Sequence, residues 1–201
     1  LARDGTEVPS PFLSLESELW DPTQTRATLL LDPGRIKQGV GPNMQSGAPL
    51  TVGESYRLVV SDSMQSAVDV PHGREASVAF RVGAAERRAL VPDDWQILPP
   101  PAGSDAPLTV VFDRIIDSGA VLRLLTVEDP HGNPDRGQIE TDGGGWSLIP
   151  DRPWQGGTYK LIVDPELEDV SGNTIGAAFD AVAGTIGTKQ EPITLTFNIT
   201  H

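Results

Sequence analysis

An alternation of apolar and polar residues occurs twice in this chain and predicts the same β-strand in two places. Residues 53–60 read Gly-x-x-Tyr-x-Leu-x-Val, and residues 156–163 read the same, 103 positions later. Alternation with a period of two places every second side chain on one face, so both segments are predicted to be half-buried strands. A repeat of about one hundred residues has the size of a β-sandwich domain and is far longer than a solenoid repeat. The chain is therefore predicted to contain two domains.

The segments that flank the repeated strand are also duplicated. Upstream of each copy, a short apolar segment ends in a turn that contains proline, at residues 27–33 and 146–151. Downstream, each copy is followed by an acidic loop and then by a second alternating strand, at residues 78–82 and 195–199. The duplication therefore extends over several predicted strands, and we expect Tyr56 to be equivalent to Tyr159 and Phe80 to Phe197.

The wider pattern predicts an all-β fold. Glycine and proline together make up 39 of the 201 residues, and no apolar stripe with helical spacing is long enough to predict a substantial helix. Residues 109–112, 121–127 and 159–163 are rich in β-branched and aromatic side chains, which favours strands. We predict two domains, at residues 1–91 and 92–201, joined by a proline-rich segment.

The first domain is predicted to be divergent or truncated at its N-terminus. Measured back from its repeated strand, the counterpart of residues 108–113 falls at or before Leu1. A sheet without that strand would have an unpaired edge, which proteins usually cover. Cover could come from residues 8–19, from the insertion at residues 34–49, or from a strand donated by upstream sequence or a neighbouring chain.

Five motifs of the second half resemble, in their order along the chain, the bacterial Ig-like domain of the SbsA type, first described in S-layer proteins. They are Pro107-Leu-Thr-Val-Val-Phe112-Asp113, Ile116-Asp117, Trp146-x-Leu148-x-Pro150, the repeated strand at 156–163, and Leu167-Glu168-Asp169-x-x-Gly172-Asn173. The resemblance covers residues 95–199. It implies an Ig-like β-sandwich that serves as a spacer or interaction module in secreted bacterial proteins, with no catalytic residues to carry over. With the repeat, it predicts two tandem Ig-like β-sandwich domains. In the second, we expect one core to contain Phe112, Trp146, Tyr159, Leu161, Val163 and Phe197.

Charge and composition exclude several partners. Residues 1–91 hold 11 acidic and 9 basic side chains (−2), and the remainder holds 17 and 6 (−11), which gives the net charge of −13. Such acidity argues against nucleic acid and anionic lipid, because both need clustered Lys and Arg. The chain has no cysteine and no apolar run of membrane-spanning length. We expect an extracytoplasmic protein with protein partners or neighbouring domains, and no membrane span.

The acidic loop after the second repeated strand is a candidate calcium site. Calcium prefers six to eight oxygen ligands, and five oxygen-bearing side chains fall within ten residues: Asp164, Glu166, Glu168, Asp169 and Asn173. The alternative is structural. Asp169 would accept backbone N–H bonds, and Asn173 would take a left-handed turn position after Gly172. No other cofactor is predicted.

Other chemistry has weaker support. The three histidines (His72, His131 and His201) and the close carboxylate pairs (Asp113 with Asp117, Glu166 with Asp169) occur among turn-forming residues, so we predict no enzyme. Trp20 and Trp154 lie in predicted loops, where exposed rings could bind carbohydrate. The sequence favours a non-catalytic spacer, adhesion or assembly module of a larger bacterial protein. The alternative is a calcium- or carbohydrate-binding accessory domain of a secreted enzyme.

Overall fold

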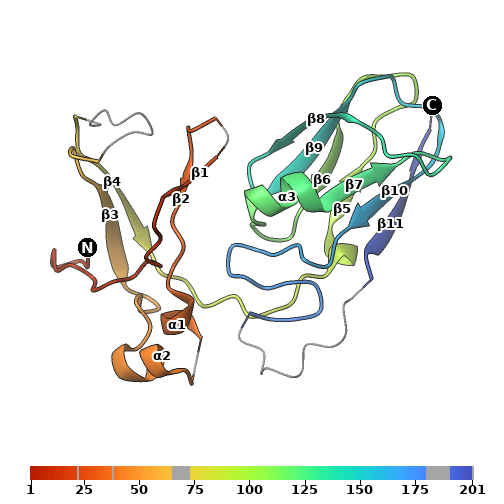
Figure 1. The fold of residues 1–201 in the computed structure, drawn as a ribbon. Helices are drawn as coiled ribbons and strands as arrows, with labels where there is room; N and C mark the ends of the chain where they lie inside the picture. Colours follow the sequence, from red (N-terminus) through yellow and green to blue (C-terminus); the bar gives the residue numbers. More distant parts are fainter. Residues whose placement is uncertain (22, 38, 65–72, 180–190, 201) are drawn as a thin grey trace. The chain divides into compact units, whose positions relative to one another are not determined.

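The computed structural model describes residues 1–21, 23–37, 39–64, 73–179 and 191–200, and these divide into two compact units (Figure 1). Unit 1 comprises Leu1–Ala85 and unit 2 comprises Glu86–His201. The boundary expected after Val91 therefore falls inside unit 2, and the residues from Glu86 to Val91 belong to the second unit.

Unit 2 contains two antiparallel sheets. The first has the order β5-β6-β9-β8, formed by β5 (Gln96–Leu98), β6 (Leu108–Val111), β9 (Gly145–Pro150) and β8 (Gly137–Thr141). The second has the order β11-β10-β7, formed by β11 (Ile193–Ile199), β10 (Gly157–Val163) and β7 (Leu125–Glu128). One short 3-10 helix, η1 (Pro92–Asp94), precedes β5.

The described residues of unit 2 form one hydrophobic core, and both sheets contribute to it. The strands of the core alternate between buried and more exposed residues, as in β10, where Tyr159, Leu161 and Val163 are buried. The six residues that the sequence predicts to share this core are all buried in one cluster: Phe112, Trp146, Tyr159, Leu161, Val163 and Phe197. This prediction is confirmed.

One predicted strand is partly helical. Residues 121–127 were expected to be extended, but α3 (Ser118–Leu124) occupies their first half and β7 begins only at Leu125. The Asp117 side chain caps this helix, because its Oδ1 accepts the Ala120 N–H at 2.7 Å. A cap of this kind satisfies an N–H that would otherwise lack a partner in the first turn. The apolar run alone could not distinguish the two conformations.

Unit 1 is built from short elements. It contains the two-residue strands β1 (Leu19–Trp20) and β2 (Ala27–Thr28), the helices α1 (Pro33–Ile36) and α2 (Gly41–Ser46), and the hairpin of β3 (Ser55–Val60) and β4 (Ala76–Arg81). Helix α2 lies within the predicted insertion at residues 34–49, and α1 begins one residue before it.

The repeated hairpin has the same register in both units. Tyr56 pairs with Phe80 and Leu58 with Val78 in unit 1, as Tyr159 pairs with Phe197 and Leu161 with Leu195 in unit 2. The Tyr–Phe rings are stacked in both hairpins, with centroids 6.0 Å apart in unit 1 and 5.7 Å apart in unit 2. The equivalences expected from the sequence therefore hold within the paired strands.

Burial differs sharply between the units. Among the described residues, every buried Leu, Ile, Val, Phe, Trp, Tyr and Ala side chain belongs to unit 2. The buried charged residue of unit 1 is Arg35, whose guanidinium donates to the carbonyl groups of Pro9, Ser46 and Gly47. Polar contacts to backbone carbonyls therefore hold together the part of unit 1 that surrounds α1 and α2.

Antiparallel strands dominate the described residues and the helices are few and short, so the all-β prediction is confirmed at this level. None of the helices in the described parts of the chain has the length and apolar character needed to span a bilayer.

Candidate functional site

The acidic loop of residues 164–173 follows β10 directly, and its first carboxylate closes a local turn. Asp164 Oδ1 accepts the Glu166 N–H at 2.9 Å, and the Asp164 carbonyl accepts the Leu167 N–H at 3.0 Å. This turn directs the Leu167 side chain into the core, where it is fully buried, while Glu166 and Glu168 are exposed.

Asp169 and Asn173 form the buried part of this loop. Asp169 Oδ1 accepts the N–H groups of Ser171 at 2.8 Å and of Asn173 at 3.0 Å. Asn173 Nδ2 donates back to both Asp169 carboxylate oxygens, at 3.1 and 2.9 Å. The structural role expected for Asp169 is thus confirmed.

The left-handed position in this loop belongs to Gly172, whose φ is 78°. The expectation that Asn173 takes that conformation is wrong. A Cβ built on Gly172 would lie 2.6 Å from Cδ2 of Phe179, so the ring also excludes a side chain here. Glycine is the residue that tolerates both constraints.

The amide of Asn173 joins three separate parts of unit 2. Its Oδ1 accepts the Phe179 N–H at 2.9 Å, and its Nδ2 also donates to the Glu86 carbonyl at 3.2 Å. The residue is completely buried. Because a buried polar group without a partner is costly, this arrangement fixes Glu86 and Phe179 against the acidic loop.

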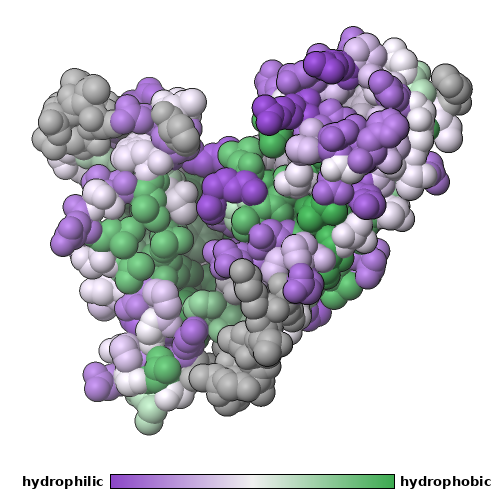
Figure 2. Space-filling model, turned by 45° about the vertical axis from the view of Figure 1, so that its right-hand side comes forward, coloured by the Kyte–Doolittle hydropathy of each residue, from purple (hydrophilic) through white to green (hydrophobic). Residues whose placement is uncertain are grey.

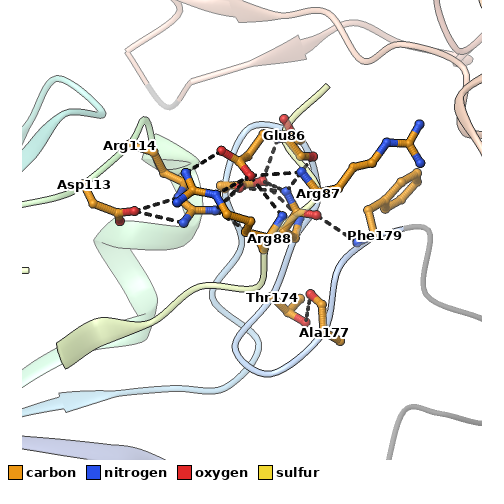
Figure 3. A network of polar contacts seen from close by, with 11 residues as sticks. Glu86, Arg87, Arg88, Asp113, Arg114, Thr174, Ala177 and Phe179 are labelled. Carbon is orange, nitrogen blue, oxygen red and sulfur yellow. Dashed lines mark hydrogen bonds and ion pairs between the residues drawn. The ribbon is translucent and has the colours of Figure 1, made fainter. Parts of the chain in front are cut away.

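Arg114 completes the network that Figure 3 shows around Glu86 and Arg88. Its guanidinium donates to Asp113 Oδ2 at 2.9 and 3.0 Å and to the Arg88 carbonyl at 2.8 Å. It also lies 3.7 Å from a Glu86 carboxylate oxygen and 3.6 Å from Asp169 Oδ2. One largely buried cation therefore connects the acidic loop to the first residues of unit 2.

Electrostatics favour the charged form of Glu86. Hydrogen bonds from the Arg88 side chain and backbone, helped by the positive charge of Arg114, hold the pKa of Glu86 at about 2. Glu168 differs: although its side chain is exposed, partial desolvation beside the loop and the nearby carboxylates of Asp117 and Asp169 raise its pKa.

Backbone and apolar contacts of Leu90 also attach the first residues of unit 2 to the segment after the acidic loop. The Leu90 N–H donates to the Thr174 carbonyl at 3.0 Å, and Leu90 forms a parallel bridge with Ile175. The side chains of Leu90 and Ile175 are both buried in the core. Residues 86–90, which the sequence analysis placed at the end of the first domain, are therefore a structural part of unit 2.

The five predicted calcium ligands do not converge. Among the described residues, no three His, Asp or Glu side chains are placed to hold a metal ion. Asp169 and Asn173 do contact one another, but Asp164 bonds within its own turn. The calcium site stays a prediction that these contacts do not support.

A second loop in unit 2 has the same geometry as residues 169–173. At residues 129–133, which read Asp-Pro-His-Gly-Asn, the Asp129 Oδ1 accepts the N–H groups of His131 and Asn133, both at 2.8 Å. Asn133 Nδ2 donates to the Asp129 carboxylate, and Gly132 has a φ of 81°. The loop at 129–133 is exposed and hydrogen-bonds mainly to itself, so the Asp-x-x-Gly-Asn sequence folds this way without further partners.

The other candidate residues also have structural partners. Asp117 caps α3, and Asp113 pairs with Arg114. Trp154, predicted to lie in a loop, is buried against Tyr159 in an edge-to-face contact, and its Nε1 donates to the Ala106 carbonyl at 2.8 Å. A ring in that position cannot serve as an exposed sugar platform. Trp20 is half-buried in β1, while His72 and His201 lie outside the described residues.

Unit 2 also has an open groove of about 430 Å³ beside the edge strands β5 and β11. Its lining consists of Pro92, Asp93, Trp95, Ile97 and residues 194–197. None of the residues that the sequence analysis proposed as ligands or catalysts lines it.

No protein-family model matches the sequence, and no curated protein matches it. The network of Glu86, Arg114, Asp169 and Asn173 therefore has to be interpreted from its geometry. Sequence reasoning found Asp169 and Asn173 but missed Glu86 and Arg114. The available signal was the charged segment 86–88, which is followed by the apolar residues Ala89 and Leu90.

Proposed function

We propose that this chain is a non-catalytic structural or binding module of a larger bacterial extracytoplasmic protein, built from tandem Ig-like domains. In this proposal unit 2 is a complete Ig-like β-sandwich, and unit 1 is a divergent member. The module acts as a spacer or as an adhesion or assembly element, with protein partners or neighbouring domains of the same chain.

The strand order of unit 2 carries the proposal. If β5 to β11 are given the letters A to G in chain order, the two sheets have the orders A-B-E-D and G-F-C. Constant-type immunoglobulin domains have this order. The Tyr159 hydroxyl supports the assignment. Tyr159 lies near the start of the sixth strand, and its hydroxyl accepts the N–H of Gln155, four residues upstream, at 3.2 Å. A tyrosine in that position forms the tyrosine corner of such folds.

The polar network favours a structural role for the geometry that the loops at 129–133 and 169–173 share. The carboxylates and the amide at its centre bond to protein groups: Asp169 to Asn173 and Arg114, and Asn173 to Glu86 and Phe179. Together with the Leu90–Ile175 bridge, these bonds fasten the first residues of unit 2 to its body. A spacer that transmits tension needs such an attachment, because load enters a domain through its terminal segments. No contact among the described residues favours the calcium- or carbohydrate-binding alternative.

Mechanical unfolding of the whole chain tests this proposal. Pulled from its two ends, unit 2 should open in one all-or-none step, because its sheets share one core. Residues 86–201 would then release roughly 35–40 nm of chain at about 3.5 Å per residue. A Tyr159→Ala variant should lower the force of that step, whereas Gln138→Ala, on the exposed side of β8, should leave it unchanged. Several small steps at low force would contradict the spacer proposal.

A further inference from the structure

Residues 86–90, here called the strap, follow unit 1 directly and lie outside both sheets of unit 2. None of them belongs to a strand of either sheet, and β5 begins only at Gln96. Successive strap residues are instead held by separate contacts with the body of unit 2: the Glu86 carbonyl with Asn173, the Arg88 carbonyl with Arg114, and the Leu90 N–H with Thr174. Each of these contacts can break without breaking a bond of either sheet.

The amide that holds Glu86 is kept in place by groups outside the strap. Asn173 Nδ2 donates to the Asp169 carboxylate, and Asn173 Oδ1 accepts the Phe179 N–H. The exposed loop at residues 129–133 keeps the same Asp-x-x-Gly-Asn geometry and hydrogen-bonds mainly to itself. That loop shows that the geometry does not need a strap beside it. Asn173 therefore keeps its orientation when Glu86 leaves.

The guanidinium that holds the Arg88 carbonyl is also fixed independently. Arg114 donates two hydrogen bonds to Asp113 Oδ2, at 2.9 and 3.0 Å, and lies 3.6 Å from Asp169 Oδ2 (Figure 3). Charge-assisted pairs of this kind are the stronger hydrogen bonds of proteins. The body of unit 2 thus contains a preformed receptor for the strap, which consists of Asn173 and Arg114.

The charged side chains of the strap lose little when it leaves this receptor. The Arg88 side chain is 72% exposed, and its guanidinium pairs with the Glu86 carboxylate at 2.8 Å, within the strap itself. The ion pair that breaks on release is the one between Glu86 and Arg114, at 3.7 Å. Ion pairs that are partly exposed contribute little to stability.

Release of the strap also exposes little apolar surface. Leu90 is the one buried side chain of residues 86–90, whereas opening of unit 2 would expose the core that both sheets share. Hydrophilic residues cover much of the visible surface of unit 2 in Figure 2, as expected of a unit whose apolar side chains lie in its core. Because apolar burial dominates stability, release of the strap costs far less free energy than unfolding of unit 2.

We propose that the strap is a reversible latch. Tension from unit 1 enters unit 2 at Glu86, so it acts on the contacts of Glu86, Arg88 and Leu90 in that order. The strap leaves while the two sheets keep their shared core, and it binds Asn173 and Arg114 again when the tension falls. Release of residues 86–90 lengthens the link between the units by roughly 15–18 Å, at about 3.5 Å per residue. This inference rests on the proposed spacer role and gives the spacer an extensible joint.

Hydrogen exchange of the Leu90 amide in the whole chain measures opening of the latch. This amide is bonded to the Thr174 carbonyl and is exposed when the strap leaves, whereas the Leu161 amide in β10 reports opening of unit 2. Leu90 should exchange at least about tenfold faster than Leu161, and low concentrations of urea should not change its rate, because local opening exposes little surface. Equal exchange of the two amides would mean that the strap leaves only when unit 2 unfolds, and the proposal would be wrong.

A matched pair of asparagine variants tests the receptor. Asn173→Ala removes the donor to the Glu86 carbonyl and should raise the exchange rate of Leu90, relative to that of Leu161, by about three- to tenfold. Asn133→Ala removes the equivalent amide from the loop at 129–133 and should leave this ratio unchanged. If the two variants raise the ratio equally, the strap is not held by Asn173.

Glu86→Gln is a second variant, and it leaves the receptor intact. It weakens the attraction between the strap and Arg114 and should raise the same ratio of exchange rates by about two- to fivefold. An unchanged ratio in both Glu86→Gln and Asn173→Ala would overturn the latch.

Pulling the whole chain separates failure of the latch from failure of the spacer role. Below the force that opens unit 2, one reversible extension of roughly 15–18 Å is expected, and Asn173→Ala should lower its force. Absence of that extension, with unit 2 still opening in one large step, would remove the latch and leave the spacer role standing. Opening of unit 2 itself in several small steps would remove the spacer role, and with it the latch.

Discussion

The two units contain the same hairpin in different surroundings. In unit 2, Tyr159 is 2% exposed and Leu161 is fully buried, because a second sheet covers them. In unit 1, Tyr56 and Leu58 are half-buried, and the whole of β4 is exposed. Register and ring stacking are therefore properties of the local sequence, since both units keep them. Burial of the hairpin depends instead on the surrounding strands and the second sheet, since its side chains are buried in unit 2 and are not in unit 1.

The largest expected difference between the units comes from truncating the equivalent tyrosines. Tyr159→Ala should destabilise unit 2 by roughly 3–5 kcal/mol, because it removes a buried aromatic ring and leaves a cavity. Tyr56→Ala should cost unit 1 about 1 kcal/mol, because its ring is already partly hydrated. Urea titrations of both variants, followed by the signals of each unit, measure the two values. Equal losses would mean that Tyr56 is as well covered as Tyr159.

The paired Asp-x-x-Gly-Asn loops provide a second comparison, within unit 2. Asn173→Ala should cost about 2–3 kcal/mol, because it removes the buried amide that bonds to the Asp169 carboxylate, the Phe179 N–H and the Glu86 carbonyl. Asn133→Ala removes the same turn contacts from an exposed loop and should cost at most about 1 kcal/mol. Thermal unfolding of the two variants tests whether burial, and not loop geometry, sets the cost. If Asn133→Ala proved the more damaging, the network would not be what attaches Glu86.

Much of unit 2 could be predicted from its sequence. Strict alternation in residues 156–163 and 195–199 identified both the strands and the core residues, because period two has few other structural meanings. Residues 121–124 were misassigned, because Val121 and Leu124 fit a helix as well as a strand and the outcome depended on the cap from Asp117. Tertiary contacts could not be found in this way. The role of Arg114 depends on Glu86 and Asp169, which are distant in sequence.

Unit 1 was less predictable for a related physical reason. The repeat identified its hairpin and the equivalence of Tyr56 and Tyr159, but the residues before it carry little alternation. There the structure forms two-residue strands, and the guanidinium of Arg35 bonds to carbonyl groups of Pro9 and Gly47. A buried arginine that bonds to backbone groups leaves no periodic pattern in the sequence.

A smaller effect should depend on pH. The pKa of Glu86 is lowered from 4.5 to about 2 by its bonds to Arg88 and by Arg114, so its charged form stabilises the fold. That contribution is present above pH 4.5 and is lost as the pH falls toward 2. The melting temperature of Glu86→Gln should therefore lie below that of the parent chain at pH 6, and the difference should shrink toward pH 2. Glu166→Gln, at an exposed position of the acidic loop, is the control and should show no such trend. A difference that is constant from pH 6 to pH 2 would mean that the Glu86 charge contributes nothing.

Hydrogen exchange at two equivalent amides tests the central claim, that one hairpin sequence lies in a closed core in unit 2 and in an open sheet in unit 1. Leu58 pairs with Val78 and Leu161 with Leu195, so the two amides have the same position in their hairpins. Leu161 should exchange only when unit 2 unfolds as a whole, and Leu58 should exchange through local opening, at least about a thousandfold faster. Equal protection of Leu58 and Leu161 in the native chain would contradict the account.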